Sequence, residues 1–254
     1  MAKITFLGTA ASIPSKNRDN TSFLFTYKGL YLLVDCSGSI VYKLKKLGIN
    51  YKKIRHIIIT HEHPDHLYGL PHFIHACAYT SMPLYIFSNK KTLNIIKKMV
   101  GLFKLNSKDY PSVHYIDVFK KPIFFSLKNL YVKAVPNKHK SQSFGVLFNW
   151  KNKSLFYSSD TALSKKIIQT ALECTYLIHD CTASSYFFNR HPSLYRMHTD
   201  AKSLTRTFKD TLLKKIIPIH FLLSNKKETM RIKKELQPLK QKIIIPRDFQ
   251  TIIL

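Results

Sequence analysis

Four side chains able to bind metal, three imidazoles and the carboxylate of Asp65, lie close together in the segment Thr60–His66, whose sequence is THEHPDH. Imidazole and carboxylate groups are ligands that divalent transition metals take from proteins. The segment directly follows the apolar run His56–Ile59, which predicts a buried strand ending at the cluster. Pro64 then indicates a turn, because proline does not continue a central strand. Ligand type, spacing and strand context together predict a metal site rather than a chance group of surface histidines.

Three further polar residues each follow an apolar run farther along the chain. They are His139 after residues 134–138, Asp160 after residues 155–159, and His220 after residues 216–219. Sheet-based enzymes collect their site residues at the ends of buried strands. Each of the three alone would more often be a cap or a surface residue. Their joint occurrence predicts that they share one site with the first cluster.

The elements that must position these residues form two similar halves. Apolar runs predict strands at 4–7, 22–27, 30–34, 56–59, 84–87, 130–135, 144–150, 155–157, 176–178, 216–219 and 242–245, with a hairpin turn at Lys28-Gly29. Helical spacing predicts helices at 40–47, 66–79, 92–103, 201–208 and 226–236. Two sets of strands, each followed by helices, predict an α/β fold with two mixed sheets face to face and helices outside.

Length and composition favour a single compact domain over residues 1–254, since 45% of the 254 residues are hydrophobic. No linker or short repeat interrupts the sequence. No apolar run approaches the ~20 residues that cross a bilayer, so no membrane partner is expected. Residues 4–11 are interpreted as a first strand rather than a signal peptide, which predicts a cytoplasmic protein. The four cysteines form no CxxC pair, and reduced thiols are expected.

The charge balance is strongly basic, with 41 Lys and Arg against 14 Asp and Glu, a net charge of +27. This excess could attract RNA or another phosphate-bearing ligand. A genome biased toward lysine codons would also give many surface lysines, although it would not explain why acids are scarce. Both interpretations stay open, because the basic residues are spread along the whole chain.

Several motifs resemble the metallo-β-lactamase-fold hydrolases, and more narrowly the ribonuclease Z branch and its phosphodiesterase relatives. Residues 6–15 with 18–22 are similar to the opening of that branch, and Leu33–Cys36 is similar to its aspartate-containing strand end. His61–His66 matches the HxHxDH motif of the superfamily, and Gly69–Pro71 matches the Gly-Leu-Pro extension typical of ribonuclease Z. The resemblance covers nearly the whole chain and implies a four-layer αββα sandwich.

The resemblance also implies a ligand set for two divalent ions. His61, His63 and His139 would hold one ion, Asp65, His66 and His220 would hold the other, and Asp160 would bridge both. Such ligands suit Zn²⁺ best, with Mn²⁺ or Fe²⁺ as alternatives. Two ions about 3.5–4 Å apart can supply a hydroxide near neutral pH and stabilise the charge of a phosphodiester transition state.

Four residues are expected to act on the substrate. The carboxylate of Asp65 could also orient the attacking hydroxide. His198 occupies the position of the histidine that the phosphodiesterase branches use as a general acid, and Thr199 is a candidate N-cap for the helix that follows. Ser141 and Ser143, just past His139, are expected to shape the phosphate pocket.

The chain departs from the resemblance in two places. Full bacterial ribonuclease Z carries a tRNA-gripping arm between the third histidine and the bridging aspartate, whereas here residues 140–159 are filled by two predicted strands and a turn. The cysteine-rich zinc loop of the phosphoribosyl cyclic phosphodiesterases is also missing. We therefore expect a metal-dependent phosphodiesterase acting on a small cyclic or nucleotide-like substrate. A ribonuclease Z-type tRNA 3′ endoribonuclease and a non-catalytic RNA-binding protein are the alternatives, and a homodimer is left open.

Overall fold

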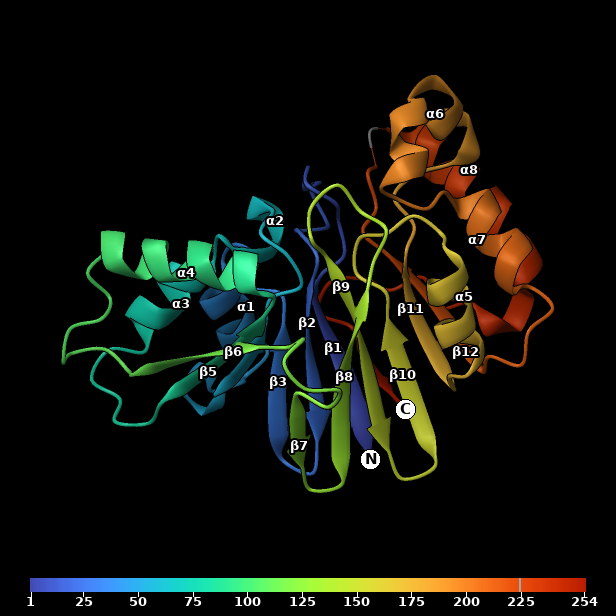
Figure 1. Ribbon diagram of the computed structural model, residues 1–254. Coiled ribbons are helices and arrows are strands. Elements are labelled where there is room, and N and C mark those ends of the chain that lie inside the picture. Colours follow the sequence, from blue (N-terminus) through green and yellow to red (C-terminus); the bar gives the residue numbers. More distant parts are fainter. Residues whose placement is uncertain (224) are drawn as a thin grey trace.

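The computed structural model describes residues 1–223 and 225–254, and within them the strands form two mixed sheets (Figure 1). The first sheet has seven described strands, in the spatial order β13 (Thr251–Ile253), β1 (Ala2–Gly8), β2 (Ser22–Tyr27), β3 (Leu30–Val34), β4 (His56–Ile58), β5 (Leu84–Ser88) and β6 (Val113–Asp117). The second has six, in the order β12 (Lys215–Ile219), β11 (Tyr176–Asp180), β10 (Lys153–Tyr157), β9 (Phe144–Trp150), β8 (Leu130–Pro136) and β7 (Phe125–Leu127).

Helices lie outside the two sheets, most of them over the outer faces (Figure 1). Those of the first half are α1 (Ile40–Lys46), the 3-10 turn η1 (Tyr51–Lys53), α2 (Pro64–Leu67), α3 (Leu70–Ala76) and α4 (Lys90–Leu102). Those of the second half are α5 (Lys165–Leu172), α6 (Ser185–Arg190), η2 (Pro192–Arg196), α7 (Ala201–Phe208), α8 (Lys226–Leu236) and η3 (Gln237–Lys242). Figure 1 shows α1, α3 and α4 on one side of the sandwich and α5, α7 and α8 on the other.

The core between the sheets is built from aromatic side chains. Phe25 on β2 stacks on Phe148 on β9 with ring centroids 4.5 Å apart, and Phe23 meets the edge of Tyr157 at 5.0 Å. One further apolar cluster lies between the first sheet and its helices, and another lies between the second sheet and its helices. A strand that is covered on both faces is apolar along most of its length, and β2 has this pattern. The predicted four-layer αββα sandwich is confirmed.

Strand direction brings the site residues to one edge of the sandwich. β3, β4, β5 and β6 run parallel in the first sheet. In the second sheet β10, β11 and β12 run parallel, and β8 has the same direction because β9 is antiparallel to both of its neighbours. The carboxyl ends of these parallel strands therefore lie along the same edge within each sheet.

Two predicted elements differ from the structure, and five observed strands and α-helices have no counterpart in the prediction. The helix predicted at 66–79 is divided into α2 and α3 at Gly69, whose amide donates to Cys36 O while a Cβ there would overlap with Ser37 O. The strand predicted at 242–245 is not a strand, because only Ile243 forms a single bridge to Ile216. The elements β6, β7, β13, α5 and α6 were not predicted from the sequence.

Within residues 1–223 and 225–254, no helix combines the length and apolar character needed to cross a membrane. The four cysteines are free thiols, as expected from their spacing.

Candidate metal centre

The loop after β4 is shaped by buried polar contacts. Asp35, at the end of β3, accepts a hydrogen bond from Thr60 N at 2.8 Å and another from the Thr60 hydroxyl at 3.2 Å. Pro64 starts α2, where its missing N–H has no cost. The chain therefore leaves β4, turns at once and directs the histidines of the loop inward.

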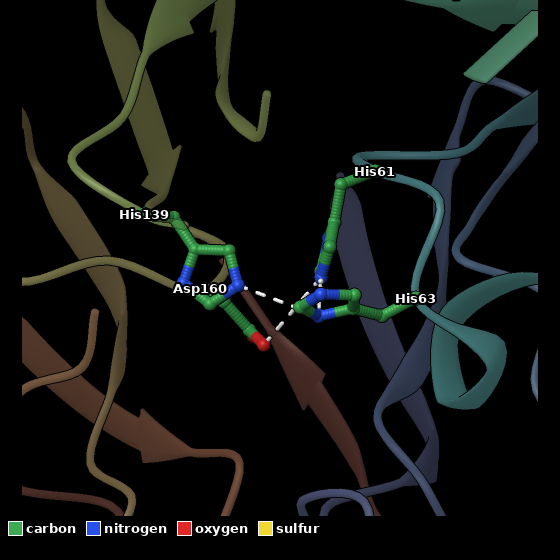
Figure 2. A group of neighbouring side chains, drawn as sticks. All are labelled: His61, His63, His139 and Asp160. Carbon is green, nitrogen blue, oxygen red and sulfur yellow. Dashed lines mark hydrogen bonds and ion pairs between the residues drawn. The ribbon is translucent and has the colours of Figure 1, made fainter. Parts of the chain in front are cut away.

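One group of donor atoms combines this loop with the second sheet. His61 Nε2 lies 3.0 Å from His63 Nδ1, and His139 Nε2 lies 3.4 Å from the same atom. Asp160 Oδ2 lies 3.7 Å from His61 Nε2. Figure 2 shows the four side chains pointing toward one another from the two halves of the molecule. One donor atom from each lies within 4.8 Å of all the others, as a single ion requires.

A second group adjoins the first through the same carboxylate. His66 Nε2 and His220 Nε2 each lie 3.6 Å from Asp65 Oδ2. Asp160 Oδ2 lies 3.4 Å from His66 Nε2 and 3.1 Å from His220 Nε2. The structure thus brings together all seven side chains that the sequence nominated as ligands, with Asp160 between the two groups.

Unsatisfied buried atoms test whether these residues fit a metal. His66 Nε2, His220 Nε2 and Asp160 Oδ1 are buried and have no hydrogen-bond partner among the described residues. Burying polar atoms without partners is costly, and a metal ion would remove that cost. The donor set is mixed imidazole and carboxylate, which suits a divalent transition metal. The cluster therefore fits divalent metal binding.

The electrostatics of the cluster favour positive charge. Burial alone would lower the pKa of His66, but Asp160 and Asp35 outweigh it and hold that pKa well above its usual value. Burial alone would raise the pKa of Asp160, but His220 and His66 hold it well below its usual value. Opposite charges in this pocket therefore stabilise one another, and the carboxylates that favour positive charge on His66 would favour a bound cation in the same way.

Buried acceptors orient three of the imidazoles. A carboxylate or carbonyl oxygen only accepts, so His66 Nδ1 donates to Asp35 Oδ2 at 2.9 Å and His139 Nδ1 donates to Met197 O at 2.9 Å. The Thr182 hydroxyl donates to Asp180, so it accepts from His220 Nδ1 at 3.2 Å. Each bond leaves Nε2 with its lone pair free to bind a metal.

Asp35 and Tyr157 also orient this site, but neither has a site role predicted from the sequence. Asp35 was recognised only as a motif residue, although an aspartate at a strand end is a usable signal. Tyr157 reaches across from the second sheet and donates its buried hydroxyl to Asp35 Oδ2 at 3.2 Å. No local pattern marks that contact.

His198 lies beside the two groups. Its ring centroid is 5.0 Å from that of His139 and 5.2 Å from that of His220. His198 Nδ1 donates to Asp180 Oδ2 at 2.8 Å. Burial would lower the pKa of His198, but the Asp180 carboxylate outweighs it and raises the pKa to about 9. The helix after it is capped by Asp200, which accepts from Ser203 N, so the prediction of Thr199 as the N-cap was wrong.

The two serines nominated for substrate binding have different surroundings. The Ser143 hydroxyl is buried and donates to Asp160 O at 3.3 Å, so it holds the backbone of the central carboxylate. The Ser141 hydroxyl is buried and has no partner among the described residues. Their role in substrate binding stays a prediction.

Comparison with known sequences gives one family and several relatives. The family model described as anti-Pycsar protein Apyc1 matches residues 2–242. Ribonuclease Z of Methanocaldococcus jannaschii is 32% identical over 149 residues, covering 58% of this chain and 47% of that protein. Ribonuclease Z 2 of Schizosaccharomyces pombe mitochondria is 26% identical over 231 residues, covering 85% and 33%. The chain spans about half the length of such relatives, or less.

Solved structures agree on the fold. The metallo-β-lactamase fold protein YhfI of Bacillus subtilis superposes with a TM-score of 0.82 at 16% identity, with both chains fully covered. The short form of human tRNase Z gives 0.79 at 21% identity, covering 99% of this chain and 98% of that one. The predicted resemblance to the ribonuclease Z-like branch of metallo-β-lactamase-fold hydrolases is confirmed.

Proposed function

The chain belongs to the family of the anti-Pycsar protein Apyc1, and we propose that it is a metal-dependent phosphodiesterase acting on a small cyclic or nucleotide-like phosphodiester. The observation that carries the proposal is the position of Asp160 Oδ2, within 3.1 to 3.7 Å of three imidazole nitrogens from both donor groups. His61, His63 and His139 would hold one ion, Asp65, His66 and His220 the other, and Asp160 would contact both.

Two divalent ions, with Zn²⁺ favoured by the ligand types, would supply a water nucleophile near neutral pH and offset the negative charge of the transition state. Burial alone would raise the pKa of Asp65, but His66 and His220 lower it to about 2. Asp65 is therefore ionised at neutral pH and can accept a hydrogen bond from the attacking water. This orients the water toward the phosphorus.

His198 is the proposed general acid. Asp180 holds its Nδ1 and raises its pKa, so the imidazole keeps a proton on Nε2 at neutral pH. Its ring adjoins those of His139 and His220, one from each donor group, which supports a position beside the phosphate of a substrate. An imidazolium there can protonate the departing alkoxide.

A second candidate is a ribonuclease Z-type endonuclease, favoured by the 149-residue match to ribonuclease Z of M. jannaschii. Against it stands the segment between His139 and Asp160. That segment forms β9, the turn at Lys151-Asn152 and β10, so it carries no projecting arm. The small substrate is therefore preferred.

Turnover of three substrates distinguishes the small-substrate phosphodiesterase from the endonuclease. Metal-loaded protein is assayed with bis-p-nitrophenyl phosphate, a 2′,3′-cyclic nucleotide and a 3′-extended tRNA at physiological salt. We expect hydrolysis of the first two and little cleavage of the tRNA. Efficient tRNA cleavage would favour the endonuclease, and no hydrolysis of any of the three would contradict the proposed function.

A further inference from the structure

Each of the four longest described helices has lysine within its first two positions. Lysine occupies the first two positions of α4, α5 and α8 and the second position of α7, although only 34 of the 254 residues are lysines. We call this set, all exposed, the lysine rim: Lys90, Lys91, Lys165, Lys166, Lys202, Lys226 and Lys227. A cation at a helix N-terminus opposes the helix dipole. Helix stability therefore does not explain the rim.

The exposed acids have the opposite placement. All the aspartates and glutamates fall within the described residues, and of these only Asp109, Glu173 and Asp210 are exposed. Asp109 follows α4, Glu173 is the C-cap of α5, and Asp210 follows α7. Glu228, in the first turn of α8, is buried and accepts from Ser184 N. Lysines also lie in the last turns of α1 and α8, but no exposed acid lies in the first turn of α4, α5, α7 or α8.

The lysine rim lies at the edge of the sandwich that holds the metal centre. α4 follows β5, α5 follows the loop of Asp160, and α8 follows the loop of His220. α7 begins shortly after His198. Lys91 pairs with Glu62, the residue between His61 and His63, at 2.5 Å. In Figure 1 the arrow of β10 points to this upper edge, where α2 and α6 also lie.

We propose that the lysine rim attracts anionic substrates to the metal centre and accelerates their association without contacting the reacting atoms. The inference rests on the proposed function, in which the substrate is a phosphodiester. A surface of one charge sign around a site raises the association rate of an oppositely charged ligand. The gain increases with the negative charge of the substrate and is screened by salt.

A pair of charge-matched variants tests the rim. The rim variant carries Lys165→Gln, Lys166→Gln, Lys226→Gln and Lys227→Gln. The control variant removes equal charge from turn and strand-end positions at the opposite edge, where hairpins join β2 to β3, β7 to β8 and β9 to β10: Lys28→Gln, Lys128→Gln, Lys151→Gln and Lys153→Gln. Substrates are 2′,3′-cyclic AMP and its 5′-phosphate, which share the scissile bond but differ in charge.

At low salt the rim variant should lose about fivefold in kcat/KM for the 5′-phosphorylated substrate and less for the other, with kcat unchanged. The loss should vanish at high salt, and the control variant should resemble the wild type. If the two variants lose kcat/KM equally while the wild type is active, the proposed role of the lysine rim is contradicted. The proposed function is then unaffected.

A binding measurement tests whether the lysine rim attracts anions, even if no substrate is hydrolysed. Fluorescence anisotropy with labelled hexathymidylate at low salt should show weaker binding by the rim variant than by the control variant. If neither cyclic substrate is hydrolysed but this difference is present, the proposed function fails and the anion-attracting rim stands. Equal binding by the two variants would contradict the proposed role of the lysine rim.

Discussion

At the scale of single residues, Asp160 joins the two halves of the site. Its Oδ2 contacts the donor groups of both, while its Oδ1 is buried without a partner among the described residues. A buried carboxylate is stable only when positive charge surrounds it. Asp160 stays ionised because His220 and His66 are adjacent, which lowers its pKa despite burial.

His198→Gln should separate acid catalysis from metal binding. An alkoxide leaving group needs a proton, whereas p-nitrophenolate leaves without one at neutral pH. We expect kcat for a 2′,3′-cyclic nucleotide to fall by roughly 10²–10⁴ and that for bis-p-nitrophenyl phosphate to change little.

His191→Gln is the matched control, because His191 is exposed. Its ring packs on Phe187, with the two ring centroids 4.5 Å apart. Metal content, measured by mass spectrometry, should be unchanged in both variants. An equal loss for both substrates, or a loss of metal in His198→Gln, would show that His198 has another role.

The sequence identified the donor residues because each follows an apolar run, and the ligand motif restricts the chemistry. It could not identify Tyr157 as a partner of Asp35. Tyr157 lies 122 residues away and reaches Asp35 only because the two sheets pack face to face. Contacts of this kind depend on tertiary packing, which no local pattern encodes.

At the scale of elements, the strands that deliver ligands were the most predictable. Buried runs such as 216–219 and 155–157 match β12 and β10 closely. The helix predicted at 66–79 failed at Gly69, because the chain must approach Ser37 there more closely than a Cβ allows. The edge strand β6, only partly buried, lacks a continuous apolar pattern and was missed.

Strand β4 contains a histidine that should make stability depend on pH. Burial, and then Arg55, lower the pKa of His56, whose ring stacks on Tyr85 with centroids 5.5 Å apart. The unfolded chain therefore takes up this proton first as pH falls below about 6.5. The contribution of His56 to stability is complete above that pH and is lost as pH falls toward its lower folded pKa.

Substituting His56→Phe keeps a stacked ring and removes the titration. Denaturant unfolding at pH 7 and pH 5 should show a smaller loss of stability in this variant than in the wild type. His114→Phe is the control. His114 also stacks on Tyr85, as His56 does, but its side chain is exposed. An unchanged pH dependence in His56→Phe would contradict the assignment.

At the scale of the whole molecule, positive charge is spread over the chain, and the lysine rim adds to it at the edge that holds the site. Most of the 14 acids are buried or partly buried, several of them in or beside the site, and few exposed acids are left to offset 41 basic residues. Codon bias would account for abundant lysine but not for the scarcity of exposed acids. That residues 1–254 fold as a single domain stays a prediction.

The central claim is that side chains between His61 and His220 bind two divalent ions. Crystals of protein loaded with Zn²⁺, measured at the zinc absorption edge, test it directly. We predict two anomalous peaks per chain, one among His61, His63 and His139 and one among Asp65, His66 and His220, both in contact with Asp160. A chain that binds no ion at these residues, or binds zinc only elsewhere, would contradict it.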